Sequence, residues 1–466
     1  MHSPNVISDA AVVILAAGQG TRMKSRMAKV LHRAGGKPLV RHAIDAALEI
    51  APPERVFVVV GYQAAEVSAQ VEAAGVQSIH QTEQLGTGHA VMCGEEKLAG
   101  LGGRLIVFVG DCPLIRAATL AQLAETQRAS GAAAAVITTE VDDPAGYGRI
   151  IRGADGGPDS SVLEIVEHKA ATPEQRAIRE INSGILSFDA DALWRHIHEL
   201  RPDNPAREYY LTDMVAILNR AGARVAALKI PDSSELLGIN NRLELADADR
   251  ILRARTIRRL LLDGVTIEKP ETVTIDADVR IGIDTVIGPF VQITGETSIG
   301  ENCRVGASSI VHSSVLEDGA EVFPFSMVSD SKLDAHSHVG PFARIRMGAH
   351  LREGAHVGNF VELKKTRMGA GSKSMHLAYL GDSIIGDKVN IGAGTITCNY
   401  DGVKKHQTVV GGGAFVGSNS TLVAPVEVGE GAYIAAGSVI TEKVPAKALA
   451  LGRSRQVNKE GWKRRE

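Results

Sequence analysis

The 466-residue sequence has few cysteines, few aromatic residues and little net charge, and each shortage excludes a class of protein. The four cysteines are widely spaced and form no Cys-x-x-Cys motif, which argues against a disulfide framework and against a zinc site. A formal net charge of −3 argues against general nucleic-acid binding. With aromatic residues at 4 %, the core must be filled mainly by Ile, Val and Leu.

Long apolar runs are also missing. No run approaches the ~20 residues that span a bilayer. Residues 1–10 lack the charged-then-apolar pattern of a signal peptide. We therefore expect a cytoplasmic protein with reduced thiols and no membrane insertion. The length predicts two or three domains.

An aliphatic residue recurs every six positions in the last third of the chain. The three runs are Ile275, Ile281, Ile287, Ile293, Ile299 and Val305; Leu333, Val339, Ile345, Leu351, Val357 and Leu363; and Val410, Val416, Leu422, Val428, Ile434 and Ile440. A period of six fits neither a helix nor a continuous strand. It fits a solenoid in which each hexad is a short strand plus a corner, with three hexads to a coil and coils about 4.8 Å apart. A Gly-rich sandwich would need three coincidental runs, so we predict a parallel β-helix.

The first part of the chain alternates apolar strands with helical stretches. Residues 11–15 are predicted to form a buried parallel strand that runs directly into the turn Gly18-Gln19-Gly20. Backbone N–H groups in such a turn can hold phosphate, although the dinucleotide and Walker motifs are incomplete and a tight turn alone would look similar. Arg22 and Lys29 place two cations just after the turn, as displacement at a phosphate requires.

Asp111 follows another predicted strand, residues 105–109. Open α/β sheets bind ligands at the carboxyl ends of their strands, so this carboxylate is a candidate metal ligand. Its alternative role is to cap the next helix.

Several motifs together resemble the sugar-1-phosphate nucleotidyltransferases. More closely they resemble the bacterial bifunctional N-acetylglucosamine-1-phosphate uridyltransferases/glucosamine-1-phosphate acetyltransferases. The matching stretches are Leu15-Ala16-Ala17-Gly18-x-Gly20-Thr21-Arg22-Met23 and residues 29–32, 84–89, 110–114, 146–150, 165–169, 180–184, 208–213 and 238–242. The hexads resemble those of left-handed β-helix acyltransferases, and the whole resemblance covers about residues 9–463.

This resemblance implies a fold and an assembly. Residues 1–239 would form an α/β nucleotidyltransferase domain with a Rossmann-like mixed sheet, and residues 240–264 a linker helix. Residues 265–466 would form a left-handed parallel β-helix of hexapeptide repeats with a C-terminal tail. The protein would be a homotrimer that binds acetyl-CoA between adjacent β-helices. The basic face within residues 242–262 leaves an RNA-binding arm as a weaker alternative to a linker.

The resemblance also implies roles in the first domain. The nucleotide UTP would be bound by Leu15, Ala16, Ala17 and Gly18, with its phosphates contacted by the catalytic cations Arg22 and Lys29. The uracil ring would be contacted by Gln81, Gly86 and Thr87, and the N-acetyl sugar by Gly148, Glu167 and Asn182. The ligands of Mg²⁺ would be Asp111 and Asn240. Mg²⁺ prefers oxygen ligands and needs only one or two from the protein when phosphates supply others. Taken alone, Asn240 would be a helix cap.

Breaks in the hexad rhythm at residues 343–346, 359–365, 374–382 and 398–406 mark a candidate acyl site. Acetyl transfer to an amine needs a base such as a histidine, although an exposed histidine is often only solvated. The resemblance implies that His376 is the general base. It also implies that glucosamine-1-phosphate is bound by Arg346, Lys364, Tyr379 and Asn390. Acetyl-CoA would be bound by Ala393, Asn399, Tyr400, Ser418, Ala436 and Arg453. Met347 and Ser374-Met375 depart from the usual pattern.

The function implied is bifunctional. The β-helix would acetylate glucosamine-1-phosphate with acetyl-CoA. The first domain would then transfer UMP from UTP to the product, giving pyrophosphate and UDP-N-acetylglucosamine, a precursor of peptidoglycan and lipopolysaccharide. The alternatives are a single-activity nucleotidyltransferase with a regulatory β-helix, a binding scaffold of the same architecture, and a zinc β-helix carbonic anhydrase using His336, His338, His350, His356 and His376.

Overall fold

The computed structural model describes residues 7–153 and 160–464. Residues 1–6, part of the segment tested for a signal peptide, lie outside it. The chain divides into two compact units between Leu252 and Arg253, and this division falls inside helix α9 (Arg242–Leu262). The helix predicted over 242–262 is therefore confirmed. The three domain boundaries given above stay a prediction.

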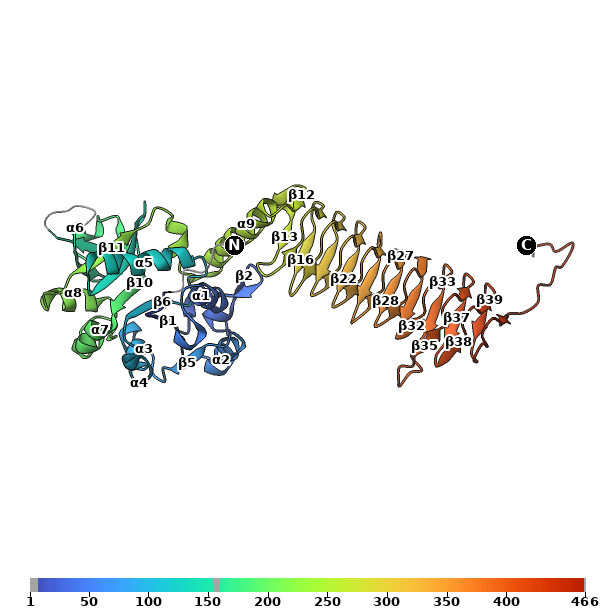
Figure 1. Ribbon diagram of the computed structural model, residues 1–466, viewed down its shortest axis with the longest axis horizontal. Helices are drawn as coiled ribbons and strands as arrows, with labels where there is room; N and C mark the ends of the chain where they lie inside the picture. The colour runs from blue at the N-terminus through green and yellow to red at the C-terminus, as the bar shows by residue number, and fades with distance from the viewer. Residues whose placement is uncertain (1–6, 154–159, 465–466) are drawn as a thin grey trace. The chain divides into compact units, whose positions relative to one another are not determined.

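The first unit is built on one mixed sheet (Figure 1). Its strand order is β11 (Val225–Lys229), β7 (Ala134–Glu140), β10 (Glu180–Asp189), β6 (Arg104–Val109), β1 (Ala10–Ala16), β4 (Val56–Val60) and β5 (Gln77–His80). Strand β10 runs antiparallel to both of its neighbours, and the other pairs are parallel. Strands β8 (Arg149–Arg152) and β9 (Val162–Val166) pair beside β10. The mixed sheet expected for this domain is confirmed.

Both faces of the sheet are buried. Alternate residues of β1 enter different clusters, with Val12 and Ile14 in one and Ala11 and Val13 in the other. Helices α1 (Leu39–Leu48), α2 (Ala64–Ala73) and α5 (Ala117–Ser130) contribute to the first cluster, and α3 (Thr87–Met92), α7 (Ala190–His196) and α8 (Asp213–Arg220) to the second. A sheet covered on both faces needs continuous apolar strands, which explains the unbroken run in residues 11–15.

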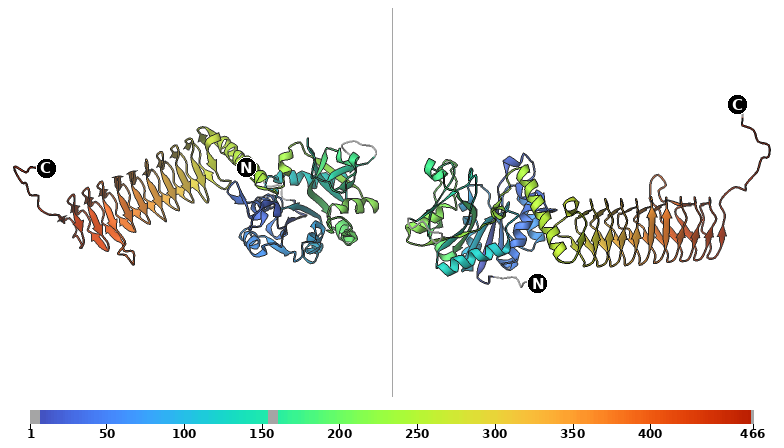
Figure 2. Two further views of the ribbon diagram at one scale, coloured as in Figure 1. Left: turned by 180° about the vertical axis from the view of Figure 1, so that it is seen from behind. Right: turned by 90° about the horizontal axis from the view of Figure 1, so that it is seen from above.

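The second unit is a parallel β-helix of stacked coils (Figures 1 and 2). One sheet runs from β12 (Thr266–Ile267) to β41 (Leu449–Ala450), a second from β13 (Thr274–Ile275) to β40 (Val439–Ile440), and a third from β14 (Arg280–Ile281) to β38 (Val426–Val428). Ile275 stacks on Ile293, three hexads later in the chain. All eighteen residues of the hexad runs are buried except Ile281, which is partly buried against the same core. The solenoid inferred from the period of six is confirmed.

One coil of the β-helix carries an insertion. Ser383 pairs with Thr408, 25 residues later, whereas Arg367 pairs with Ile384 after 17. The extra residues form a loop, 399–407, that follows β34 (Ile396–Cys398). This loop contains two of the residues predicted to bind acetyl-CoA. Among the helices that the structure describes, none has the length and apolar character needed to cross a membrane.

Candidate active sites

A cavity of about 260 Å³ opens at the carboxyl ends of β1 and β6. Ligands of open α/β sheets bind at this edge. The residues predicted to hold nucleotide or metal that line this cavity are Leu15, Ala16, Ala17, Gly18, Lys29, Gln81, Gly86, Thr87 and Asp111. Residues separated by more than ninety positions in the sequence therefore meet in one space.

The two glycines of the phosphate-loop candidate have different roles. Gly20 has a φ of +68°, and a Cβ atom there would lie 2.5 Å from the Cβ of Lys29. This glycine is needed for the turn itself, since both its backbone and its neighbour exclude a side chain. At Gly18 a Cβ would meet nothing within 4 Å, so packing within the chain does not explain that glycine. Its open side leaves room for a ligand to approach the backbone.

Lys29 is the centre of a polar cluster beside the cavity. Its ammonium forms an ion pair with Asp111 and donates a hydrogen bond to Oδ1 of Asn240 over 3.3 Å. The guanidinium of Arg22 donates to the same oxygen over 2.8 Å. The structure thus brings together all four residues predicted to handle phosphate and metal. Asn240 also donates its backbone N–H to Glu244 over 2.6 Å.

The donor chemistry of this cluster fits Mg²⁺. A carboxylate of Asp111 and an amide oxygen of Asn240 converge on one positive group, the ammonium of Lys29. Oxygen atoms that share one cation in this way can share another, and Mg²⁺ prefers oxygen ligands. In the described part of the chain, no three His, Cys, Asp or Glu side chains form a metal-binding group. A metal here would take its other ligands from phosphates and water.

A second cavity, of about 230 Å³, shares Leu15, Thr87, Val109 and Glu208 with the first. It is lined also by Glu167 and Asn182, two of the residues predicted to bind the sugar. The third, Gly148, lies beside them, because a Cβ on Gly148 would be 3.4 Å from a carboxylate oxygen of Glu167. Burial and then the charge of Asp213 raise the pKa of Glu167.

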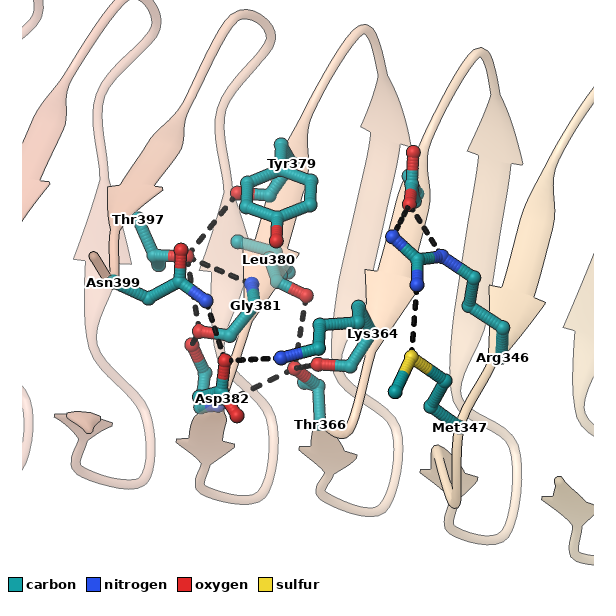
Figure 3. Close-up of polar contacts among 12 residues, drawn as sticks. Arg346, Met347, Lys364, Thr366, Tyr379, Leu380, Gly381, Asp382, Thr397 and Asn399 are labelled. Carbon is teal, nitrogen blue, oxygen red and sulfur yellow. Dashed lines mark hydrogen bonds and ion pairs between the residues drawn. The ribbon is translucent and has the colours of Figure 1, made fainter. Parts of the chain in front are cut away.

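Three residues predicted to bind glucosamine-1-phosphate lie on consecutive coils of the β-helix (Figure 3). Arg346 on β25 (Arg344–Arg346) pairs with Lys364 on β28 (Glu362–Lys364), and β28 pairs with β31 (Tyr379–Gly381), which begins with Tyr379. The ammonium of Lys364 is buried and lies 2.7 Å from Asp382. The register of one sheet therefore aligns Arg346 with Lys364, and it places Tyr379 beside Glu362, two residues before Lys364.

Asp382 holds this group in place. Its carboxylate accepts hydrogen bonds from Lys364 and from the side-chain amide of Asn399. Burial raises the pKa of Asp382, but these two hydrogen bonds, together with the charges of Lys364 and Lys405, lower it overall. The neighbouring Lys405, on the inserted loop, has its pKa lowered mainly by Lys364. Two ammonium groups that repel each other at a half-open site provide a favourable place for an anion.

The predicted base, His376, ends strand β30 (Lys373–His376) and is exposed. Its Nδ1 lies 2.7 Å from Oδ1 of Asn359, its pairing partner on β27 (His356–Asn359). An amide oxygen can only accept, so Nδ1 donates the hydrogen bond. In the neutral ring, Nε2 is then the nitrogen that can take up a proton.

His376 and three of the predicted acetyl-CoA residues occupy the same corner on successive coils. Ser374, Ile391, Val416 and Ile434 pair in register, and the residues two positions later are His376, Ala393, Ser418 and Ala436. Backbone hydrogen bonds join the corner, from Asn419 to the Ala393 carbonyl and from Gly437 to the Ser418 carbonyl. Small side chains follow the histidine along this edge and leave it open to a long ligand.

The other predicted ligands of acetyl-CoA lie close to this corner or on the inserted loop. Arg453 is adjacent to Gly437, where a Cβ would lie 4.0 Å from the Cδ of Arg453. Tyr400 is exposed and donates its hydroxyl to the Gly402 carbonyl over 2.6 Å. Asn390, predicted to bind the sugar phosphate, is not brought to Lys364, because it begins β33 (Asn390–Ile391) on a different sheet.

The two departures from the family pattern remove no functional group. Met347 accepts a hydrogen bond through its sulfur from Arg346 over 2.9 Å, and Ser374 is buried within β30. The histidines considered for a zinc site have other contacts, since His350 bonds Asp334 over 2.8 Å and the rings of His338 and His356 lie 4.8 Å apart.

Sequence reasoning missed four residues of these sites, namely Glu208, Asn359, Asp382 and Lys405. Glu208 lies in a motif that was noted without a role. The other three belong to or adjoin the hexad breaks. Their positions in those breaks were the available signal, but their partners lie on neighbouring coils.

The chain matches known proteins over almost its whole length. Residues 12–261 match the MobA-like NTP transferase domain, and residues 278–313 and 407–442 match the bacterial transferase hexapeptide repeats. The bifunctional protein GlmU of Solibacter usitatus is 59 % identical over 97 % of this chain and 96 % of its own length. The corresponding proteins of Koribacter versatilis and Pelobacter propionicus are 49 % and 47 % identical, over 97 % and 98 % of this chain and 96 % and 98 % of theirs. The predicted fold class, a nucleotidyltransferase domain followed by a left-handed β-helix of hexapeptide repeats, is thereby confirmed.

Proposed function

The chain belongs to the family of bifunctional GlmU proteins, and we propose that each of its two units carries one complete set of chemical groups for one reaction. The enzyme acetylates glucosamine-1-phosphate with acetyl-CoA. It then transfers UMP from UTP to N-acetylglucosamine-1-phosphate, which gives UDP-N-acetylglucosamine and pyrophosphate. The observation that carries the assignment of the first site is the meeting of Arg22, Lys29, Asp111 and Asn240 beside a cavity lined by Leu15 to Gly18.

In the uridylyl site, a phosphate oxygen of the sugar attacks the α-phosphorus of UTP and pyrophosphate leaves. Lys29 and Arg22 offset the negative charge that grows on the phosphate oxygens. Gly18 lets the phosphates approach the backbone, and Glu167, Asn182 and Gly148 contact the N-acetyl sugar in the adjoining cavity. Mg²⁺, bound by Asp111 and Asn240, would supply further neutralisation of phosphate charge.

In the acetyl site, the amine of glucosamine-1-phosphate attacks the thioester carbonyl of acetyl-CoA. Nε2 of His376 takes the proton that the amine loses, and the thiolate of CoA leaves and is protonated. Lys364 and Arg346 hold the sugar phosphate, with Lys364 fixed by Asp382. The open edge that runs from His376 through Ser418 to Ala436 supports binding of acetyl-CoA along it.

We also infer a homotrimer. Asn390 lies on a different sheet from Arg346, Lys364 and Tyr379, so a neighbouring copy could supply this side chain to their site. A β-helix has flat faces, and packing such faces side by side builds a cleft that a single solenoid lacks. All four cysteines are free thiols, which supports a reducing, cytoplasmic location.

The test supplies glucosamine-1-phosphate, acetyl-CoA, UTP and Mg²⁺ to the purified protein and follows thiol and pyrophosphate separately. Thiol should appear without UTP, whereas pyrophosphate should require acetyl-CoA unless N-acetylglucosamine-1-phosphate is given. Chelation of the metal should abolish pyrophosphate release and leave thiol release unchanged. Pyrophosphate release that persists after chelation would overturn the metal assignment.

A further inference from the structure

Gln81 has an unusual position in the nucleotide cavity. Its residue is only 4 % exposed, yet it contributes to the lining of that space. Its side-chain nitrogen, Nε2, lies 3.1 Å from the carbonyl oxygen of Gly86 and 3.1 Å from Nδ1 of His89. A carboxamide has two N–H donors and one oxygen, so these two contacts use the full donor capacity of the side chain.

The two contacts define how the carboxamide is oriented. The Gly86 carbonyl can only accept, so the atom facing it must be the amide nitrogen. The same nitrogen then donates its second hydrogen to His89, and Nδ1 of His89 must be the acceptor. The ring proton is therefore on Nε2. The sulfur of Cys93 lies 3.8 Å from Nε2 and 3.9 Å from Nδ1, so this contact does not distinguish the two nitrogens. The tautomer of His89 and the direction of the Gln81 amide depend on each other.

His89 is held firmly enough to act in this way. It lies in helix α3, whose first turn is tied down by a hydrogen bond of 2.7 Å from Gly88 N–H to the Tyr209 carbonyl. A Cβ on Gly86 would lie 2.7 Å from that same carbonyl oxygen, so the approach is close. The Tyr209 ring centre is 6.3 Å from that of His89. The backbone that carries the histidine cannot shift without moving this packed segment.

With both amide hydrogens engaged, Oε1 of Gln81 is the part of the carboxamide left for a ligand. Among the described residues, no protein group donates a hydrogen bond to Oε1. This oxygen is also not fully buried, so a ligand can reach it. The side chain therefore offers the cavity an acceptor and no donor. A ligand that meets it favourably must bring an N–H or O–H group.

We propose that His89 is a positioning residue that makes Gln81 an obligatory acceptor, and that this selects a pyrimidine base carrying a ring N–H. This inference rests on the proposed uridylyl transfer. Uracil has one donor on its ring, N3–H, and Gln81 Oε1 accepts it. Cytosine presents a lone pair at N3 and would place two acceptors against each other, which leaves a buried polar group unsatisfied.

The test measures kcat/KM for pyrophosphate release by the full-length enzyme with UTP, CTP and N3-methyl-UTP. The wild-type enzyme should prefer UTP over both by at least ~100-fold, since a site built for a donor rejects analogues that lack it. His89→Leu should reduce both preferences by at least ~10-fold, the effect of one lost hydrogen bond to a buried group. His89→Asn should retain them, because its Oδ1 can replace Nδ1 as the acceptor.

The controls separate this inference from the proposed function. His198→Gln changes an exposed histidine and should leave all three nucleotides ranked as in the wild type. Circular dichroism establishes whether each variant is folded. If His89→Leu does not fold, N3-methyl-UTP with the wild-type enzyme still decides, and its use as readily as UTP would overturn the inference. A folded His89→Leu enzyme with unchanged preferences would also overturn it. A wild-type enzyme that releases no pyrophosphate from UTP would instead overturn the proposed function.

Discussion

At the residue scale, a substitution in the cluster around Lys29 should affect uridylyl transfer and leave acetyl transfer unchanged. Asp111→Asn keeps the shape of the side chain but removes the negative charge that pairs with Lys29 and that would hold Mg²⁺. We expect uridylyl transfer to fall by at least ~100-fold, the order of the loss when one charge-stabilising group is removed. Acetyl transfer, measured as thiol release, should stay at its wild-type rate. An Asp111→Asn enzyme with normal pyrophosphate release would remove Asp111 from the site.

His376 and Asn359 allow a second residue-scale prediction. His376→Ala should lower thiol release by at least ~100-fold, the usual contribution of a general base. Asn359→Leu should lower kcat less, because the ring stays but loses the 2.7 Å hydrogen bond that directs Nε2 outward. The KM for acetyl-CoA should change little in either variant. Exposed His312 offers a matched control, His312→Ala. If His376→Ala acetylates normally, another group is the base.

The residues that sequence reasoning missed share a physical cause. Lys364 and Asp382 are eighteen positions apart, and they meet only because one coil of this β-helix brings Gly381, the residue before Asp382, beside Lys364. Coil length varies from 16 to 25 residues here, so the register could not be counted reliably from the sequence. The nucleotide cavity was easier, since its residues come directly after apolar strands whose carboxyl ends share one edge of the sheet.

At the element scale, the β-helix could be predicted because its signal is local. Each hexad places one aliphatic residue in the core of the coil, whatever residues lie on neighbouring coils. The linker helix was equally readable from Asp263-Gly264, which follow its last residue, and Gly264 has a φ of +94°. The hairpin of β8 and β9 was not anticipated. The antiparallel direction of β10, against which β8 pairs, was not anticipated either, because no local pattern reveals it.

The inserted loop, 399–407, should loosen in acid. Asp401 accepts from the backbone N–H groups of Lys404 and Val403 over 2.6 and 2.7 Å and contacts His406 over 2.7 Å, and these bonds lower its pKa. A carboxyl whose folded pKa is depressed contributes stability above its unfolded value of about 3.9, and this is lost as pH falls further.

Hydrogen exchange of the loop amides, corrected for intrinsic rates, should therefore speed up below about pH 4 relative to the surrounding strands. Asp401→Asn should exchange faster at neutral pH and lose this dependence on acid. Asp387→Asn changes another acidic residue of the β-helix and serves as the control. An Asp401→Asn loop that is protected as in the wild type would contradict the prediction.

At the scale of the whole molecule, two cores are built separately. The α/β unit contains the clusters on either face of its sheet, and the β-helix contains one continuous core. All the proposed uridylyl groups lie in residues 15–240, and all the proposed acetyl groups lie in residues 346–453. No proposed catalytic group is shared, so the two reactions should survive separation of the units.

A fragment of residues 1–252 should fold, remain monomeric and release pyrophosphate from UTP and N-acetylglucosamine-1-phosphate, since one α/β crevice can enclose these small substrates. A fragment of residues 242–466 keeps the whole of α9 and should be trimeric by light scattering and active in acetyl transfer. Its activity per chain should fall on dilution together with the fraction of trimer, because Asn390 would come from a neighbouring copy. Asn390→Ala mixed with a Lys364→Ala chain should restore part of the activity that each lacks alone, because mixed trimers contain some sites with both side chains intact. A monomeric fragment that acetylates at the full rate would exclude a shared site.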